Sequence, residues 1–362
     1  MAFEPLVSFI SAESDAQLAG ARAVGFDKLM YGVDVLDGDI DPPLEIVAAG
    51  LTSHSQDTAG PMTRSVRDAA LLAQVMAGPD PADPATAKAD LAGHDFLTGL
   101  KPDALKGVRV GVMRFAAGFH PETDAAFDRS LKALSAAGAT LVEIEKRPSA
   151  PNLGKLEQVV LMTELKVDLG TYLGSTRPEQ VASRSLADLI AFDKAHADKE
   201  MPLFGQEEFE TAEKTKGLSD PEYLKAEADA HRMAGPEGID KLLHDNNVAV
   251  LVAPTIGPAW LIDPVLKDQF VGGGAGQDAA VAGYPHLTVP MGLVDGLSVG
   301  LSFIGPAWSD ARLLAYGYAF EQATHARRPP KYLASSVSED AGAGAARRAG
   351  EPARRARAPS SR

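Results

Sequence analysis

One stretch of the sequence, residues 108–144, constrains the fold more tightly than any other, because it holds a strand, a helix and a second strand in succession. Residues 108–113 and 140–144 are short apolar runs, which predict two strands. Between them lies an apolar stripe with helical spacing that ends at Gly138. The stripe consists of Phe127, Leu131 and Leu134. This order makes a βαβ unit, which requires parallel neighbouring strands and a right-handed crossover.

The rest of the chain continues the alternation of helix and strand. A helix is predicted to begin after Ser65, which forms a capping box with Asp68, and to stop at Gly78. Residues 154–246 are predicted to be largely helical, and a last helix covers residues 309–324. Further strands are predicted at 248–252, 287–291 and 299–304. The sequence therefore predicts an α/β fold with a mixed β-sheet flanked by helices on both faces.

Composition excludes several classes of protein. With 45% hydrophobic and 23% charged residues, the chain has the make-up of a soluble globular protein. Its net charge of −14 argues against a nucleic-acid partner, which requires clustered Lys and Arg. The lack of cysteine excludes disulfides and thiolate chemistry. We expect a cytoplasmic protein without a membrane partner, because no apolar run approaches about 20 residues and the first residues do not resemble a signal peptide.

Four motifs in a fixed order carry the functional information. Residues 55–64 read Ser-Gln-Asp-Thr-Ala-Gly-Pro-Met-Thr-Arg and lead directly into the predicted helix. Val-Ala-Pro-Thr stands at 252–255, Ala-Gly-Tyr-Pro at 282–285 and Gly-Leu-Ser-Val-Gly at 296–300. In this order they resemble the amidase-signature hydrolases, which cleave amide C–N bonds. The resemblance covers about residues 51–333.

Within that family the chain is most similar to the bacterial peptide amidases, through residues 55–62, 184–192, 203–206 and 281–285. The resemblance implies a small amide or peptide-amide substrate and no cofactor. It also implies a catalytic triad of Lys, a bridging Ser on a cis peptide and a nucleophilic Ser, together with a Gly-rich oxyanion loop.

No part of the sequence matches that triad. Between Ser14 and Thr52 there is no Ser, Thr or Cys, and Lys28 is the only lysine before Lys88. The neighbours of Lys28 match no motif of the family. We therefore expect a chain that lacks the N-terminal catalytic part of the fold and is impaired when alone.

The resemblance assigns two groups of site residues. Those placed by family-like segments where they could touch substrate are Asp57, Phe204, Thr255, Trp260 and Tyr284. Phe204 and Trp260 fit core packing equally well, and Asp57 is better suited to bracing its loop, as is Arg64. The residues of the structural motifs are Ser55, Gly60, Pro61, Arg64, Gly283, Pro285 and Pro290.

Other patterns are weaker. Gly296-Leu-Ser298-Val-Gly300 fits a nucleophile elbow in its letters, but Ser298 precedes a predicted strand instead of a helix. Ser53, His54 and Asp57 lie too close in sequence for a triad and predict a polar loop network. The histidines have no metal-binding spacing, so no metal site is expected.

The predicted organisation has three parts: an atypical segment at 1–50, an amidase-like domain at 51–333, and a disordered tail rich in Arg and Ala at 334–362. Three functional hypotheses follow. The chain is an impaired amidase, a non-catalytic remnant that binds amides or has only a structural role, or a C-terminal half that a separate N-terminal fragment completes. Its oligomeric state is open.

Overall fold

The computed structural model describes residues 52–81, 86–87, 89, 93, 95–263, 265 and 267–329. The expectations for residues 1–50 and 334–362 lie outside these ranges. Contacts divide the chain into two compact units, Met1–Ala326 and Arg327–Arg362, and the elements below belong to the first.

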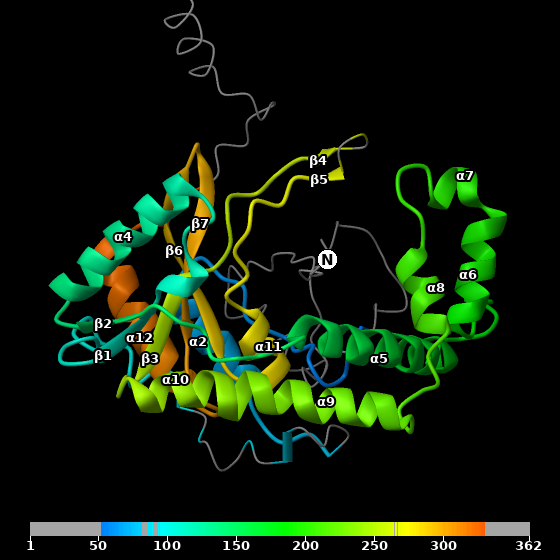
Figure 1. The fold of residues 1–362 in the computed structure, drawn as a ribbon, viewed down its shortest axis with the longest axis horizontal. Coiled ribbons are helices and arrows are strands. Elements are labelled where there is room, and N and C mark those ends of the chain that lie inside the picture. The colour runs from blue at the N-terminus through cyan, green and yellow to red at the C-terminus, as the bar shows by residue number, and fades with distance from the viewer. Residues whose placement is uncertain are drawn as a thin grey trace, which may run out of the picture. The chain divides into compact units, whose positions relative to one another are not determined.

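A five-stranded sheet forms the centre of this unit, in the order β2-β1-β3-β7-β6 (Figure 1). Its strands are β1 (Arg109–Met113), β2 (Thr140–Ile144), β3 (Val250–Pro254), β6 (His286–Val294) and β7 (Leu297–Ile304). β1 runs parallel to β2 and β3, whereas β7 is antiparallel to both of its neighbours. The predicted βαβ unit and the mixed sheet are both confirmed.

Two strand boundaries differ from the prediction for local reasons. β3 begins at Val250 instead of residue 248, because Val248 N–H still caps the preceding helix by donating to Leu243 O at 3.0 Å. β6 and β7 are longer than predicted because Asp295 and Gly296 join them in a two-residue turn. Their φ values of 49° and 83° suit the tight hairpin that favours Asp-Gly.

One face of the sheet packs against three helices: α2 (Val66–Met76), α4 (Pro121–Ala136) and α12 (Asp310–Thr324). Phe127, Phe303 and Phe320 are fully buried between these layers. α2 begins as predicted, since the Ser65 side chain accepts from Asp68 N–H, a capping hydrogen bond. This face holds the larger of the apolar clusters.

The opposite face packs against a helix that changes its winding and against a short helix, α11 (Gln277–Ala282). The long helix comprises α9 (Pro221–Ala234), a π-helical turn at Gly235–Ile239 and α10 (Asp240–Asp245). α9 also packs along α5 (Leu153–Ser175), as Figure 1 shows. Residues 154–246 are thus largely helical, as predicted.

Smaller elements extend from this frame. They are η3 (Arg114–Ala116), α6 (Leu186–Ala195), α7 (Ala197–Glu200), α8 (Glu207–Glu213), and the two-stranded sheet of β4 (Ile262–Asp263) and β5 (Lys267–Asp268). α6 and α8 pack with α5 around a separate small apolar cluster. In the described part of the chain, no helix has the length and hydropathy that crossing a membrane requires.

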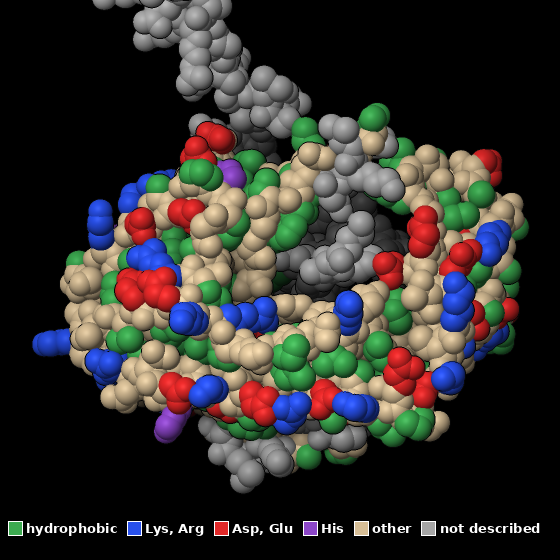
Figure 2. Space-filling model, in the orientation of Figure 1, with side chains coloured by type: hydrophobic (Ala, Val, Ile, Leu, Met, Phe, Trp, Pro, Cys, Tyr) green, Lys and Arg blue, Asp and Glu red, His purple; other side chains and the backbone are tan. Residues whose placement is uncertain are grey.

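Acidic and basic side chains alternate along the outer surface of the long helix (Figure 2). Asp229 pairs with both Lys225 and Arg232, and Arg232 also reaches Glu237. Such exposed pairs contribute at most about 1 kcal/mol each. They are the solvated side of a helix whose other side is buried.

Candidate functional site

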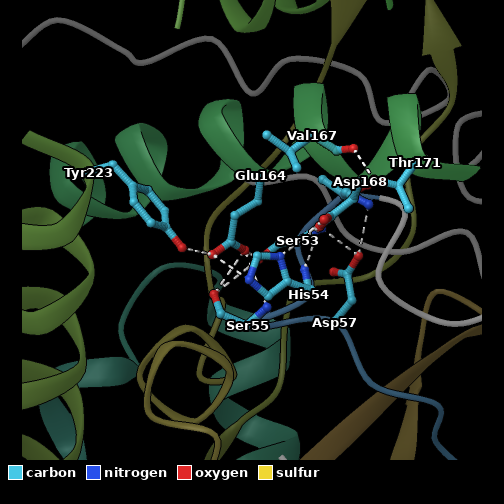
Figure 3. Close-up of polar contacts among 10 residues, drawn as sticks. Ser53, His54, Ser55, Asp57, Glu164, Val167, Asp168, Thr171 and Tyr223 are labelled. Carbon is cyan, nitrogen blue, oxygen red and sulfur yellow. Dashed lines mark hydrogen bonds and ion pairs between the residues drawn. The ribbon is translucent and has the colours of Figure 1, made fainter. Parts of the chain in front are cut away.

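The carboxylate of Glu164, in the middle of α5, is the centre of the most connected polar site (Figure 3). Its side chain is 0% exposed. Oε2 accepts hydrogen bonds from Ser53 Oγ at 2.5 Å, Ser55 Oγ at 2.9 Å and Ser55 N–H at 3.2 Å. Oε1 accepts one from Tyr223 OH, on α9, at 2.6 Å. A buried carboxylate needs this many donors to offset the loss of water.

His54 lies between this carboxylate and a second one on the same helix. Its Nδ1 is 3.0 Å from Asp168 Oδ2, and its Nε2 is 3.7 Å from Glu164 Oε1. Glu164 and Asp168 are four residues apart, so α5 presents both on one side. Burial acts to lower the pKa of His54, but the hydrogen bond to Asp168 and the charges of both carboxylates outweigh it and raise that pKa. When protonated, His54 places a cation between these two carboxylates.

Asp57 closes the same loop on itself. Its Oδ2 accepts from the backbone N–H groups of Thr52 and Ser53, both at 3.1 Å. Partial burial raises the pKa of Asp57, while these two hydrogen bonds act in the opposite direction. The geometry is that of a loop brace, the role the sequence favoured for Asp57; contact with substrate stays a prediction.

Three of these residues could hold a metal ion. Ligand atoms of His54, Glu164 and Asp168 all lie within 4.8 Å of one another. Glu164, however, already accepts four hydrogen bonds, and Nδ1 of His54 faces Asp168. A metal would therefore compete with the His54–Asp168 hydrogen bond and with the serine hydroxyls that donate to Glu164.

A second polar cluster lies on the sheet itself, just beyond the end of β3. Thr255 Oγ1 is 2.8 Å from Ser302 Oγ and 3.1 Å from Thr288 Oγ1. Ser302 Oγ is in turn 2.7 Å from Nε2 of His286. His286 is exposed as a residue, but desolvation of its imidazole by the surrounding protein lowers its pKa to about 4, so the ring is neutral at pH 7. Because parallel α/β sheets bind ligands beyond the carboxyl ends of their strands, this is a second candidate site.

The remaining candidates are dispersed. Phe204 and Trp260 are exposed, and Trp260 packs edge-on against Phe270 with ring centroids 5.5 Å apart. Tyr284 donates its hydroxyl to Asp240 Oδ2 at 2.7 Å, which ties α11 to α10. Burial and this bond raise the pKa of Tyr284 to about 12. Of the five candidates, the structure thus places Asp57 in the first cluster and Thr255 in the second, and their contacts with substrate stay predictions.

The residues of the structural motifs mostly shape the backbone. Gly283 ends α11 at φ 65°, a left-handed conformation that glycine adopts without strain, and Pro285 O accepts from Gly305 N–H at 3.4 Å. Pro290 lies at a register shift in β6. Gly60, Pro61 and Arg64 lie on the loop that leads to α2, where Arg64 is exposed and has no ion-pair or hydrogen-bond partner among the described residues. Ser55 is the motif residue that enters the Glu164 site.

Sequence reasoning missed Glu164 and Asp168, which lie more than 100 residues from the loop that they bind, and Tyr223, which donates to Glu164 from α9. His286 and Ser302 stand within segments that resemble the family, but nothing in the sequence pairs them. The signal that could have found Glu164 is an acidic residue on the apolar side of a helix, next to Leu165.

Ser55 also borders a small pocket of about 160 Å³, between the loop, α9 and α11. Glu227 and His231 line it from α9, and Gly283 lines it from the end of α11. The polar network and this pocket therefore share one wall.

Comparison with known proteins relates this geometry to one family. The sequence profile of the Amidase family matches residues 47–314. A probable amidase from Arabidopsis thaliana is 32% identical over 305 residues, which is 79% of this chain and 54% of that protein. One subunit of the glutamyl-tRNA(Gln) amidotransferase from Rhodospirillum rubrum is 31% identical over 302 residues, 79% of this chain and 57% of that protein. The chain spans about half the length of the curated relatives it matches.

Two solved structures show which members of the family resemble this chain in fold. Native peptide amidase from Stenotrophomonas maltophilia matches with a TM-score of 0.72 and 44% identity, over 78% of this chain and 56% of that one. An amidase family protein from Bacillus anthracis matches with a TM-score of 0.63 and 29% identity, over 77% and 51%. The chain thus belongs to the amidase-signature family, and peptide amidase is a close structural neighbour.

Proposed function

We propose that this chain is the C-terminal part of a hydrolase that cleaves linear amide C–N bonds, with a peptide C-terminal amide as its substrate. The observation that carries the proposal is the 44% identity to native peptide amidase over 78% of the chain. The placement of Thr255 just beyond the carboxyl end of β3 supports it, because open α/β sheets bind ligands at that edge.

The proposal includes reduced activity of the chain alone. No segment of the sequence matches the lysine, the bridging serine or the nucleophile of the family. In the described residues, the hydroxyls of Ser53 and Ser55 are held by a buried carboxylate, and no lysine reaches them. A serine needs a general base to attack an amide, and a Glu164 carboxylate that already accepts four hydrogen bonds is poorly suited to that role.

Release of ammonia from a peptide amide tests the proposal directly. The purified chain is incubated with N-acetyl-phenylalaninamide, with full-length peptide amidase from Stenotrophomonas maltophilia as the positive control. We expect turnover at least a thousandfold below the control. Turnover within tenfold of the control would show that the chain carries a complete catalytic apparatus.

A complementation experiment separates the two alternatives. The N-terminal part of the same peptide amidase, up to the residue that aligns with Leu51, is produced together with the full chain. Restored ammonia release favours a C-terminal half completed by a separate fragment. Binding of amides without product, with or without the fragment, favours a non-catalytic remnant.

A further inference from the structure

The polar cluster on the sheet lies where the side chains on one face change from apolar to polar. On this face β3 and β7 first present Leu251, Ala253 and Ile304, which α10 and α11 cover. The next positions along the strands carry hydroxyls and an imidazole instead. His286 and Thr288 are exposed and Thr255 is half-buried, while Ser302 is 0% exposed beneath them. We call these four residues the hydroxyl relay.

Hydrogen-bond directions in the relay are linked. Each hydroxyl has one proton, so if Ser302 donates to Nε2 of His286, Thr255 must donate to Ser302 and Thr288 must donate to Thr255. Thr288 Oγ1 then offers only lone pairs to a ligand, and Nδ1–H of His286 offers a proton. The relay therefore ends in one acceptor and one donor.

The opposite direction of the hydrogen bonds also leaves one donor and one acceptor at the ends of the relay. If Nε2–H donates to Ser302 and the protons run toward Thr288, the hydroxyl of Thr288 becomes the outward donor and Nδ1 of His286 the acceptor. With a neutral imidazole, the relay never has a hydrogen-bond donor at both of its ends. Desolvation favours this neutral form of His286.

Two glycines keep the ends of the relay open. A Cβ on Gly276 would lie 3.1 Å from both Nδ1 and Cε1 of His286, so a side chain there would press against the edge of the ring that carries Nδ1. A Cβ on Gly300 would lie 2.5 Å from Cγ2 of Thr288 and 3.1 Å from Oγ1 of Thr255. No described residue forms a hydrogen bond with Nδ1 of His286.

We propose that His286 and Thr288 form a subsite that recognises a neutral amide and discriminates against a carboxylate. A primary amide presents an acceptor, its oxygen, and a donor, its NH₂ group, which match the two ends of the relay in either direction. A carboxylate presents acceptors only and meets a lone pair at one end. His286 and Thr288 are two residues apart on one face of β6, about 6.6 Å along the strand, which an amide with its two hydrogen bonds can span.

This inference rests on the proposed function, because it separates a peptide-amide substrate from its peptide-acid product. Ser302 and Thr255 are positioning residues in it: they set the proton directions, and His286 and Thr288 contact the ligand. The subsite selects the ligand and does not supply a nucleophile.

Binding of matched probes tests the subsite without relying on turnover. 3-Phenylpropanamide and 3-phenylpropanoate, which carry no second amide, are titrated at pH 7 into the full chain labelled with ¹³C at histidine Cε1, and the His286 resonance is followed. We expect the amide to shift this resonance and to bind at least tenfold more tightly than the acid.

Two substitutions probe the ends. Thr288→Val keeps the side-chain shape, and His286→Phe keeps a ring. Each is expected to lower amide affinity at least fivefold and to bring the amide-to-acid ratio near one, as measured by isothermal titration calorimetry, which needs no His286 resonance. The matched controls are Thr211→Val on α8 and His244→Phe on α10, both exposed and neither hydrogen-bonded to a relay residue. Melting curves identify a variant that has not folded, and the isosteric Thr288→Val alone suffices for the test.

The outcomes distinguish the two proposals. Equal binding of both probes, no binding of either, or amide binding unchanged in Thr288→Val overturns the subsite. Selective amide binding without ammonia release leaves the subsite standing and counts against hydrolysis. Hydrolysis that is indifferent to Thr288 counts against the subsite alone.

Discussion

Tyr223→Phe removes a single hydroxyl from the Glu164 site and leaves the ring packing in place. The hydroxyl is 2.6 Å from Glu164 Oε1, and the Glu164 side chain is 0% exposed. Tyr223 itself is 6% exposed, so water cannot replace the lost donor freely. A hydrogen bond to a charged group contributes about 1.5–3 kcal/mol. Since Ser53 and Ser55 continue to donate to the other oxygen, we expect a loss of about 2 kcal/mol in the free energy of unfolding.

Urea denaturation followed by circular dichroism measures this loss, and a thermal melt should fall by roughly 4–8 °C. The matched control is Tyr172→Phe on α5, a half-buried tyrosine whose hydroxyl has no hydrogen-bond partner among the described residues. A double-mutant cycle with Ser53→Ala should show coupling, because both hydroxyls donate to one carboxylate. If Tyr223→Phe and Tyr172→Phe destabilise by the same amount within about 0.5 kcal/mol, the carboxylate site does not stabilise the fold as argued.

Three further outcomes are expected. Because folding raises the pKa of His54, its contribution to the free energy of unfolding is complete below the unfolded value near 6.5 and is lost as the pH rises through the folded value. Urea denaturation from pH 5 to 9 should show this loss in the parent protein and not in His54→Gln. The same pH dependence in both proteins would refute it. Gly300→Ala should cost about 1–3 kcal/mol, since its Cβ would lie 2.5 Å from Thr288 Cγ2. Gly170→Ala, inside α5 with no atom within 4 Å of the added Cβ, should stabilise the fold by about 0.5–1 kcal/mol in the same melts. A Gly300→Ala variant that is more stable than Gly170→Ala would contradict the packing described.

The sequence predicted those parts of the fold that depend on neighbouring residues. The strands β1 and β2 and the helix between them follow from local periodicity, and the capping bond of Ser65 follows from a four-residue pattern. The boundary of β3 was wrong by two residues, because a helix-closing bond at Val248 is not visible in an apolar run.

The sites were less accessible to prediction for a physical reason. Glu164 looks like one more charge on a helix until the packing of α9 against α5 buries it, and its partners come from residues 53–55 and from Tyr223. The relay is likewise created by strand register: Thr288 and Ser302 are direct partners only because β6 and β7 pair as they do. Spacing in one sequence does not determine such contacts between segments.

The π-helical turn at Gly235–Ile239 has a consequence for how the unit unfolds. A π turn adds a residue to the winding, so the helix after it is rotated by about 100° relative to the helix before it. Before the turn, Tyr223 faces α5 and the Glu164 carboxylate; after it, Asp240 faces Tyr284, and Leu242 and Leu243 face the sheet. One continuous helix therefore belongs to two packing regions, which also share the first turn of α5 through Leu153 and Leu156. Melting of either region should propagate to the other as a single cooperative transition.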